Sequence, residues 1–358
     1  MNKKLYDLAE YLAPVWKTNF IRNETVMFLG EEDSAPLLST PDGEVSVKNY
    51  FLDKTYVEGK DYKIENGVIY RLKGGDIPYI RVEDYYLTDP GKYSIGVDMD
   101  KIPYKFDSPR YLAYGEEDTF TKFQIAVSYT HKDVWKGRTP TGKKLRFRGF
   151  FDKLAAGERI NVTFYGDSIT TGCNSSGTDM GGNVPPYMDS FPVMMCEHLT
   201  KNLSADISYA NVAVGGWDTR QGLLAFDERV LPTAPDLLIL GFGMNDLHTP
   251  LDEYKDMIEE MMLRLRKQNP KAEVMLVATM WPHTESTWVL NQIRTLPKLL
   301  ELEGQYPFAS VADMTTMHED ILATGKRYRD MTGNNINHPN DFMARVYAQV
   351  LLATLLDE

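Results

Sequence analysis

The chain has 358 residues, of which 43% are hydrophobic and 25% are charged, and this length suits two globular domains better than one. Its formal net charge of −12 makes the phosphate backbone of a nucleic acid an unfavourable partner. No apolar run reaches 18 residues, which argues against a transmembrane helix, and two cysteines are too few for a disulfide scaffold. We therefore expect no nucleic-acid or membrane partner and a reducing, cytoplasmic location.

The start of the chain does not resemble a signal peptide. Asp7 interrupts the apolar core that such a peptide needs. Leu5, Leu8 and Leu12 instead fall on one face of a helix. We expect an N-terminal helix within residues 1–19.

Residues 20–155 have the pattern of an all-β domain. Short runs rich in Tyr, Val and Ile alternate with turn residues, and Asn66-Gly67 predicts a tight hairpin because both residues tolerate positive φ. The regular spacing of the runs favours a β-sandwich, in particular a jelly roll, as an accessory domain. The expected strands are Val45–Phe51, Tyr62–Ile64, Val68–Leu72, Tyr79–Val82, Tyr93–Val97, Phe120–Tyr129 and Lys144–Phe150.

Residues 156–358 alternate between predicted strands and helices. The expected strands are Ile160–Tyr165, Ile207–Val214, Asp236–Phe242, Glu273–Thr279 and Ala309–Ala312. The expected helices are Phe191–Leu203, Leu251–Gln268, Thr287–Leu302 and Phe342–Leu356. Five strands with interposed helices predict an α/β domain with a flavodoxin-like, doubly wound parallel sheet. Such sheets bind ligands at the carboxyl ends of their strands.

Three of the predicted strands end in residues that can do chemistry. Ser168 closes a Gly-Asp-Ser triplet, Gly216 belongs to a Gly-Gly pair, and Asn245 lies in a Gly-Met-Asn-Asp run. Each motif alone also suits a turn or a helix cap. His338, on a polar loop before the last helix, would complete a Ser–His pair of nucleophile and general base. The backbone N–H groups and the amide then offer three oxyanion donors, each typically worth about 3–4 kcal/mol.

These four motifs, in this order, resemble those of the SGNH (GDSL-type) hydrolase superfamily of esterases and lipases. The resemblance extends from Arg159 to the C-terminal end of the sequence. It implies ester hydrolysis without a metal or organic cofactor. It also implies roles for six residues: Ser168 as the nucleophile, Gly216 and Asn245 in the oxyanion hole, His338 as the base, and Asp167 and Asp246 in support.

The sequence departs from the family pattern at one position. The family usually places an aspartate three residues before the histidine, where this chain has Asn335. An amide can orient the imidazole of His338 but supplies no negative charge. Either another carboxylate reaches His338, or a backbone carbonyl orients it in a Ser–His dyad. The two-domain carbohydrate acetyl esterases of this superfamily resemble the second case and also begin with a jelly roll, which favours sugar deacetylation.

Four ring-bearing side chains are candidates for a substrate-binding wall. Tyr187 lies in an insert after the nucleophile, and Trp217, Trp281 and His283 follow predicted strands. Such walls suit sugar rings as well as acyl chains.

The preferred interpretation is a serine esterase that removes short acyl groups, above all acetyl, from carbohydrates or other small esters through an acyl-serine intermediate. One alternative keeps this site but changes the substrate to a lipid, lysophospholipid or thioester. A second alternative is a carbohydrate-binding protein whose hydrolase site has decayed. The negative charge is confined to the C-terminal part, so this part and the neutral β region could also meet in a contact between two copies.

Overall fold

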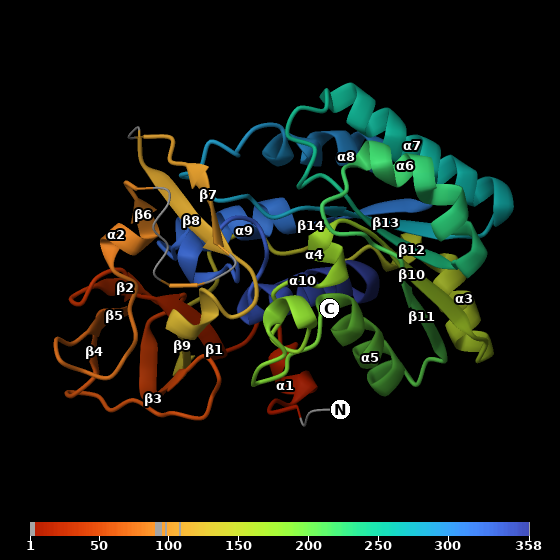
Figure 1. The fold of residues 1–358 in the computed structure, drawn as a ribbon. Helices are drawn as coiled ribbons and strands as arrows, with labels where there is room; N and C mark the ends of the chain where they lie inside the picture. Colours follow the sequence, from red (N-terminus) through yellow and green to blue (C-terminus); the bar gives the residue numbers. More distant parts are fainter. Residues whose placement is uncertain (1–3, 90–94, 97–98, 107–108, 358) are drawn as a thin grey trace.

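The computed structural model of the chain describes residues 4–89, 95–96, 99–106 and 109–357. The expected strand Tyr93–Val97 lies largely outside these ranges, so the structure does not test it. In Figure 1 the antiparallel strands gather on one side, and the parallel sheet with its helices fills the other. None of the helices in the described ranges is both long enough and apolar enough to cross a membrane.

The C-terminal part contains the five-stranded parallel sheet that the sequence predicts. In spatial order its strands are β11 (Ile207–Asn211), β10 (Ile160–Gly166), β12 (Leu237–Gly241), β13 (Glu273–Ala278) and β14 (Ala309–Asp313). Every neighbouring pair is parallel, which confirms the doubly wound α/β fold. This order places the topological switch point between β10 and β12, where such sheets have a crevice at their carboxyl ends.

Helices cover both faces of the parallel sheet, because its strands are apolar on both sides (Figure 1). In β12, Leu237 and Ile239 belong to one hydrophobic cluster, and Leu238 and Leu240 belong to the other. The first face is covered by α3 (Arg148–Ala156), α5 (Phe191–Leu203), α9 (Met314–Ala323) and α10 (Asp341–Leu356). The second face is covered by α6 (Thr219–Arg229), α7 (Leu251–Gln268) and α8 (Thr295–Gln305).

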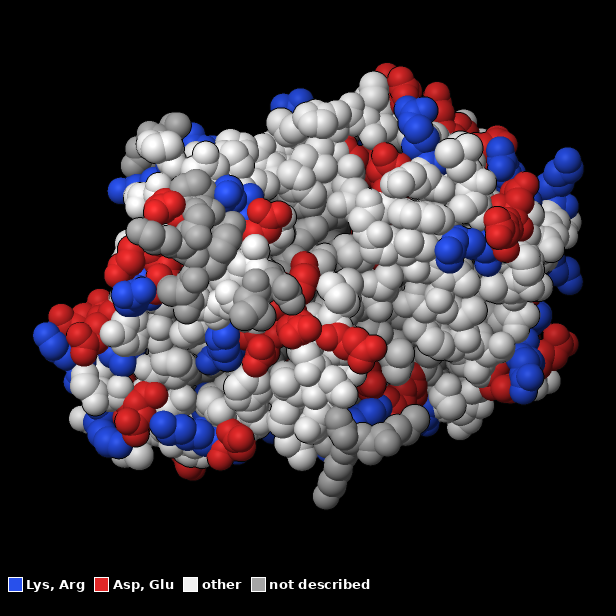
Figure 2. Space-filling model, in the orientation of Figure 1, with Lys and Arg blue, Asp and Glu red and all other residues white. Residues whose placement is uncertain are grey.

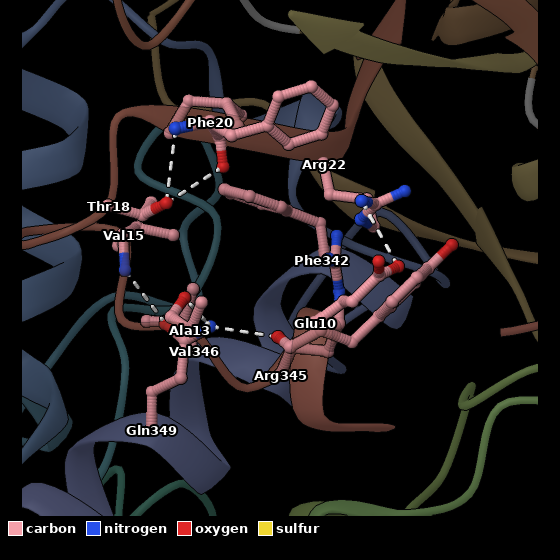
Figure 3. Close-up of a pocket in the computed structure, with 12 residues that line it drawn as sticks. Glu10, Ala13, Val15, Thr18, Phe20, Arg22, Phe342, Arg345, Val346 and Gln349 are labelled. Carbon is pink, nitrogen blue, oxygen red and sulfur yellow. Dashed lines mark hydrogen bonds and ion pairs between the residues drawn. The ribbon is translucent and has the colours of Figure 1, made fainter. Parts of the chain in front are cut away.

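Helix α10 is the central element of the molecule. All 16 of its residues are buried, as expected for a helix that is packed on every side. It contacts α5 and β14 on one side and β1 of the antiparallel region on the other. Its Gln349 donates to the carbonyl oxygens of Tyr11 and Ala13 and accepts from the N–H of Val15, which holds the N-terminal segment against the helix (Figure 3).

The N-terminal part forms three small antiparallel sheets, which confirms the expected all-β character of this region. Their strand orders are β1-β9-β3, β2-β5-β4 and β6-β8-β7. Asn66 and Gly67 form the predicted hairpin with φ values of 52° and 74°. The strands are β1 (Phe20–Met27), β2 (Ser34–Pro36), β3 (Pro41–Asn49), β4 (Tyr62–Glu65), β5 (Val68–Arg71), β6 (Tyr86–Leu87), β7 (Met99–Pro103), β8 (Tyr111–Gly115) and β9 (Gln124–His131).

The expected strand Lys144–Phe150 is wrong. This segment forms a short 3-10 helix, η2 (Lys144–Arg146), and the first turn of α3. It lies along the free edge of the parallel sheet, where Arg146 donates to the carbonyl oxygen of Ala309. Lys143, just before it, donates to the carbonyl oxygen of Val311. The basic side chains therefore cover polar groups of an edge strand instead of extending a sheet of their own.

Four other expected elements differ from the structure. The expected strand Phe120–Tyr129 begins only at Gln124, after the 3-10 helix η1 (Thr121–Phe123). Tyr79–Val82 makes only a single bridge to Leu29 before the short helix α2 (Val82–Tyr85) begins. The N-terminal helix is reduced to α1 (Leu8–Tyr11), capped by the side chain of Asp7. The helix expected from residue 287 begins only at Thr295, after the 3-10 helix η5 (Gln292–Arg294). In each case part of the expected helix or strand does not adopt the backbone conformation of that element.

The two parts of the chain share one hydrophobic core. Ile125 and Val127 of β9 belong to the same buried cluster as Met343 and Val346 of α10. The expected domain boundary between residues 155 and 156 falls inside α3. The division into 1–19, 20–155 and 156–358 stays a prediction.

Candidate active site

Ser168 lies at the carboxyl end of β10, at the first position of the short helix α4 (Ser168–Thr171). Asp167 caps this helix by accepting a hydrogen bond from the N–H of Ile169 at 2.9 Å. The chain leaves the strand sharply at Gly166, where a Cβ atom would collide with the carbonyl oxygen of Gly241 on β12. A glycine is therefore required for the turn that presents Ser168 at the switch point of the sheet.

The glycine pair after β11 lies beside Ser168. A Cβ atom at Gly215 would be 3.7 Å from the Cβ of Ser168, and Gly216 has a φ of +78° that disfavours any other residue. The turn is fixed because the N–H of Val214 donates to the carbonyl oxygen of Gly166 at 3.0 Å. Both glycines are exposed, so this side of Ser168 is open to solvent.

Asn245 and Asp246 follow β12 and fix the neighbouring loop. The Nδ2 atom of Asn245 donates to the carbonyl oxygen of Trp217 at 3.0 Å. The carboxylate of Asp246 accepts from the N–H and the hydroxyl of Thr219, the latter at 2.8 Å. These bonds connect the ends of β11 and β12, and one N–H of the Asn245 amide remains for a ligand.

A single asparagine organises the loop that carries His338. The Oδ1 atom of Asn334 accepts hydrogen bonds from the backbone N–H groups of Ile336, Asn337 and His338 at 3.0–3.1 Å. The carbonyl oxygen of His338 accepts from Thr332 Oγ1 at 2.9 Å. The backbone at His338 is therefore fixed by hydrogen bonds that do not involve the imidazole ring.

The structure brings Ser168 and His338 together. The Nε2 atom of His338 lies 2.8 Å from Ser168 Oγ, across 170 residues of sequence. On the other side of the ring, Nδ1 lies 2.7 Å from Asn174 Oδ1 and 3.1 Å from Glu116 Oε2. Both ring nitrogens thus have partners, and Ser168 faces the nitrogen that can accept its proton.

Asn335, at the position of the family's aspartate, does not face His338. Its Oδ1 accepts from the hydroxyl of Tyr85 at 3.0 Å, and its Nδ2 donates to the carbonyl oxygen of Ala113 at 2.8 Å. The left-handed backbone at Asn335, with φ of 69°, turns the side chain towards β8 instead of the imidazole. Of the two possibilities that the sequence left open, the structure has a carboxylate at the histidine, from Glu116.

Glu116 and Asn174 are the residues that sequence reasoning missed. Glu116 directly follows β8, at a distance of 222 residues from its partner, and Asn174 lies in the loop after α4. Only the acidic run Glu116-Glu117-Asp118 at the end of a tyrosine-rich strand marks the first of them in the sequence. Nothing in a single sequence pairs such a run with a loop near the other end of the chain.

Burial shapes the charges at the site. Burial raises the pKa of Asp167 to about 7 and raises that of Asp246 above its ordinary value, against the hydrogen bonds that Asp246 accepts. Burial also opposes ionisation of Glu116, but the hydrogen bond and the charge of His338 outweigh it, and the pKa of Glu116 is lowered. The carboxylate next to His338 is therefore ionised at neutral pH.

Among the described residues, no hydrogen bond connects any of the four expected substrate-binding side chains to Ser168 or His338. Trp217 is half-buried, with the guanidinium of Arg229 over its ring at 4.9 Å. Tyr187 and Trp281 are also half-buried.

The expectation for His283 is wrong. This side chain is 2% exposed, its Nε2 is 2.8 Å from the hydroxyl of Tyr85, and its Nδ1 accepts from the N–H of Glu285. Burial lowers the pKa of His283 to about 3. His283 is therefore a buried, neutral residue of the packing between the two parts of the chain, with no surface to offer a substrate.

The molecular surface is hollowed between the two parts of the chain, and acidic side chains lie around the hollow (Figure 2). Within the described ranges, no group of three or more His, Cys, Asp or Glu side chains is placed to hold a metal ion.

The fold and the site define an α/β protein with a Ser–His pair at the carboxyl edge of a doubly wound sheet. The sequence profile of the GDSL-like Lipase/Acylhydrolase family matches residues 164–346, which is just over half of the chain. The chain therefore belongs to the GDSL-like Lipase/Acylhydrolase family.

Solved structures with a similar fold include a two-domain esterase active on acetylated mannans, with 23% identity over 59% of this chain and a TM-score of 0.47. This chain spans about half, 53%, of that protein. An acetylxylan esterase from Geobacillus stearothermophilus has 16% identity over 55% of this chain, 94% of its own length and a TM-score of 0.44. A GDSL-like lipase from Parabacteroides merdae has 14% identity over 55% of this chain, 95% of its own length and a TM-score of 0.46. No protein among the curated sequences matches the chain.

Proposed function

We propose that this protein hydrolyses carboxylic esters, with Ser168 as the nucleophile and His338 as the general base. The observation that carries this proposal is the distance of 2.8 Å between Ser168 Oγ and His338 Nε2. A serine hydroxyl is a weak nucleophile until a base removes its proton, and an imidazole at hydrogen-bond distance is such a base.

The reaction proceeds by acyl transfer in two halves. In the first half, Nε2 of His338 takes the proton of Ser168 as Oγ bonds to the carbonyl carbon of the ester. The tetrahedral intermediate then breaks its bond to the alcohol oxygen, and His338 returns the proton to the leaving alcohol. In the second half, water attacks the acyl-serine by the same route, releases the carboxylic acid and restores Ser168.

The negative oxygen of each tetrahedral intermediate needs hydrogen-bond donors. Within the described part of the chain, the backbone N–H groups of Ser168 and Gly216 donate to no protein acceptor. The second N–H of the Asn245 amide adds a third donor, since only its first has a partner at Trp217. Donors that are already positioned stabilise the developing charge without reorganisation, typically by about 3–4 kcal/mol each.

The substrate that we propose is an acetyl ester of a carbohydrate. The side chains around His338 are polar, namely Glu116, Asn174, Asn334 and Asn337, and the opposite side of Ser168 is open at Gly215 and Gly216. A long acyl chain would need an apolar wall to bury against. A small acyl group on a polar alcohol does not.

Acetate release from acetylated xylo- and manno-oligosaccharides, together with a chain-length series of 4-nitrophenyl esters, tests this proposal. We expect cleavage of acetyl esters to be fastest, and we expect Ser168→Ala to lower kcat by at least about 1,000-fold. Circular dichroism spectra of both proteins control for folding.

Each alternative has its own outcome. Faster cleavage of long-chain esters or thioesters would exclude the carbohydrate substrate but keep the nucleophile. Tight oligosaccharide binding without turnover of any ester would reject the enzyme and favour a binding protein. Full activity in Ser168→Ala would reject the catalytic assignment.

A further inference from the structure

We propose that Glu116, from the N-terminal β region, takes the place of the family's missing aspartate and positions His338 together with Asn174. This inference rests on the proposed ester hydrolysis, because it assigns a partner to the general base. It also means that the active site is built from both parts of the chain, so that the β region is more than an accessory domain.

The geometry at Nδ1 of His338 carries the proposal. Nδ1 must hold the proton if Nε2 is to accept one from Ser168, so the group next to Nδ1 must be an acceptor. Glu116 Oε2 at 3.1 Å and Asn174 Oδ1 at 2.7 Å are both acceptors. One Nδ1–H shared between two acceptors fixes the tautomer and the plane of the ring.

Glu116 is itself held from two sides. Its Oε1 accepts from Nδ2 of Asn334, the residue that organises the histidine loop, at 3.2 Å. The backbone before it is fixed because the N–H of Gly115 donates to the carbonyl oxygen of Asn334 at 3.2 Å. The carboxylate therefore has a defined place relative to the loop of His338, although 222 residues separate them.

Asn335 supports this arrangement without contacting the imidazole of His338. Its amide donates to the carbonyl oxygen of Ala113, in the strand β8 that ends just before Glu116. The residue at the family's aspartate position thus fixes the strand that delivers a carboxylate from elsewhere. The charge next to the imidazole therefore comes from another part of the chain, and the neutral residue at 335 supports the strand that carries it.

Among the described residues, two carboxyl groups interact with the charge of His338, Glu116 at the end of β8 and Asp167 at the start of α4. The thiol of Cys173 lies close enough to both carboxyl groups to feel their charges. Burial raises the pKa of Cys173 to about 11, so this thiol is neutral at pH 7. Burial raises the pKa of Asp167 to about 7, so Asp167 also titrates in the pH range of an esterase assay and must be kept unchanged in every variant.

The first test compares Glu116→Gln with the wild-type chain and with Glu117→Gln. Glu117 is the exposed neighbour of Glu116, so its variant removes the same charge from the same segment without touching the imidazole. With 4-nitrophenyl acetate as the substrate, we expect Glu116→Gln to lower kcat about 100-fold, with KM changed less than about 3-fold. Glu116→Asp should recover part of this loss, and Glu117→Gln should match the wild type.

The pH dependence separates a positioning role from a structural one. A carboxylate stabilises the protonated imidazole, so its removal should move the acid limb of the kcat/KM profile to lower pH. A variant that merely folded less well would lose amplitude at every pH without this shift. An unshifted profile with wild-type kcat in Glu116→Gln would overturn the proposal.

A readout without turnover keeps this inference separate from the proposed function. In protein with ring-labelled histidine, the NMR signal that disappears in His338→Ala belongs to His338. Without the carboxylate, this signal should change with pH at a lower pH in Glu116→Gln than in the wild type. An equal midpoint would overturn the role of Glu116 even if the wild type cleaved every ester tested. A shifted midpoint in a chain that cleaved none would support it while rejecting the esterase.

Discussion

Asn335 is a buried amide at the position where the family usually has an aspartate, and its hydrogen bonds require an amide. The two halves of the amide have opposite partners, a hydroxyl that donates and a carbonyl that accepts. Only an amide satisfies both, because a carboxylate has no N–H to donate. The residue is completely buried, so no water compensates for a lost bond.

We therefore predict that Asn335→Asp, which restores the family spacing, does not raise kcat/KM. At pH 7.5 the new carboxylate would face the carbonyl oxygen of Ala113, and we expect a loss of about 3 kcal/mol in the free energy of unfolding. Urea unfolding and ester hydrolysis measure the two effects. Asn66→Asp, at an exposed turn residue that is also left-handed, serves as the control. A more active and equally stable Asn335→Asp would contradict this prediction.

At the scale of elements, packing against the sheet overrides helix propensity. Helix α6 has a glycine at position 222, its fourth residue, where alanine is intrinsically better by about 1 kcal/mol. A Cβ atom there would lie 2.5 Å from the ring of Phe242, which is buried at the end of β12. The close approach of α6 to this ring depends on that glycine.

We predict that Gly222→Ala destabilises the protein by about 1–3 kcal/mol, because the clash exceeds the gain in propensity. Gly304→Ala in α8 is the matched control. Nothing lies within 4 Å of a Cβ atom there, so this variant should gain about 0.5–1 kcal/mol. Thermal unfolding of both variants checks the pair. If both variants were more stable than the wild type, helix propensity would outweigh the clash with Phe242 in α6 as well.

Helix α9 carries a histidine that the fold keeps neutral. His318 is completely buried, its Nδ1 accepts from the N–H of Trp281, and burial lowers its pKa to about 3. In the unfolded chain a histidine titrates near 6.5. Between these values the unfolded state binds one proton more than the folded state, so stability falls as the pH drops below 6.5.

We predict that His318→Asn, which keeps an acceptor for Trp281 but cannot be protonated, loses this pH dependence. The stability of the wild type relative to this variant should decrease by about 1.4 kcal/mol for each pH unit below 6.5. Urea unfolding at pH 7.5, 6.5, 5.5 and 4.5 measures the difference. Parallel stability curves over this range would show that His318 does not cause the loss.

At the scale of the whole molecule, a buried ion pair joins the two parts of the chain. Lys326 Nζ, just before the histidine loop, lies 3.1 Å from Glu24 Oε2 in β1, and neither side chain has any exposure. Glu24 also accepts from the hydroxyl of Tyr129, and Lys326 donates to the carbonyl oxygen of Thr25. The attraction between the two groups and these hydrogen bonds offset the desolvation that burial of the pair costs.

We predict that Lys326→Met costs about 3–5 kcal/mol, because Glu24 would remain buried without its partner. The double variant Glu24→Gln with Lys326→Met should regain part of this loss. Arg220→Gln, which breaks the exposed pair of Arg220 and Glu253, should cost less than about 1 kcal/mol. Urea unfolding of the wild type and of these three variants measures the losses. Equal losses in the free energy of unfolding for Lys326→Met and Arg220→Gln would contradict the idea that burial makes the first pair more important.

The same interface explains how Glu116 reaches a histidine of the other part. Asn340, at the start of α10, donates to Thr25 and Gln124 of the β region and caps the helix that follows His338. The hydrophobic cluster around α10 contains residues of β1, β3 and β9 as well as of the parallel sheet. We expect the two parts to unfold together, because neither has a complete core without the other.

The sequence by itself predicts the elements that depend on local pattern. The apolar run at β12, the periodic helix Leu251–Gln268 and the hairpin at Asn66-Gly67 were all recognisable, because burial of a strand or a helix face has a period of a few residues. Parallel topology then implies that residues at successive strand ends meet. For this reason Ser168, Gly216 and Asn245 could be assigned to one edge without coordinates.

The tertiary structure alone decided which groups meet across the two parts of the chain. The partner of His338 at Nδ1, the burial of His283 and the helical form of the segment from Lys144 depend on contacts with residues more than 100 positions away. Periodicity carries no information about such contacts, because each is fixed by how whole elements pack. The local sequence marked Ser168 as the candidate nucleophile, whereas the packing of β8 against the loop before α10 decided which carboxylate lies beside His338.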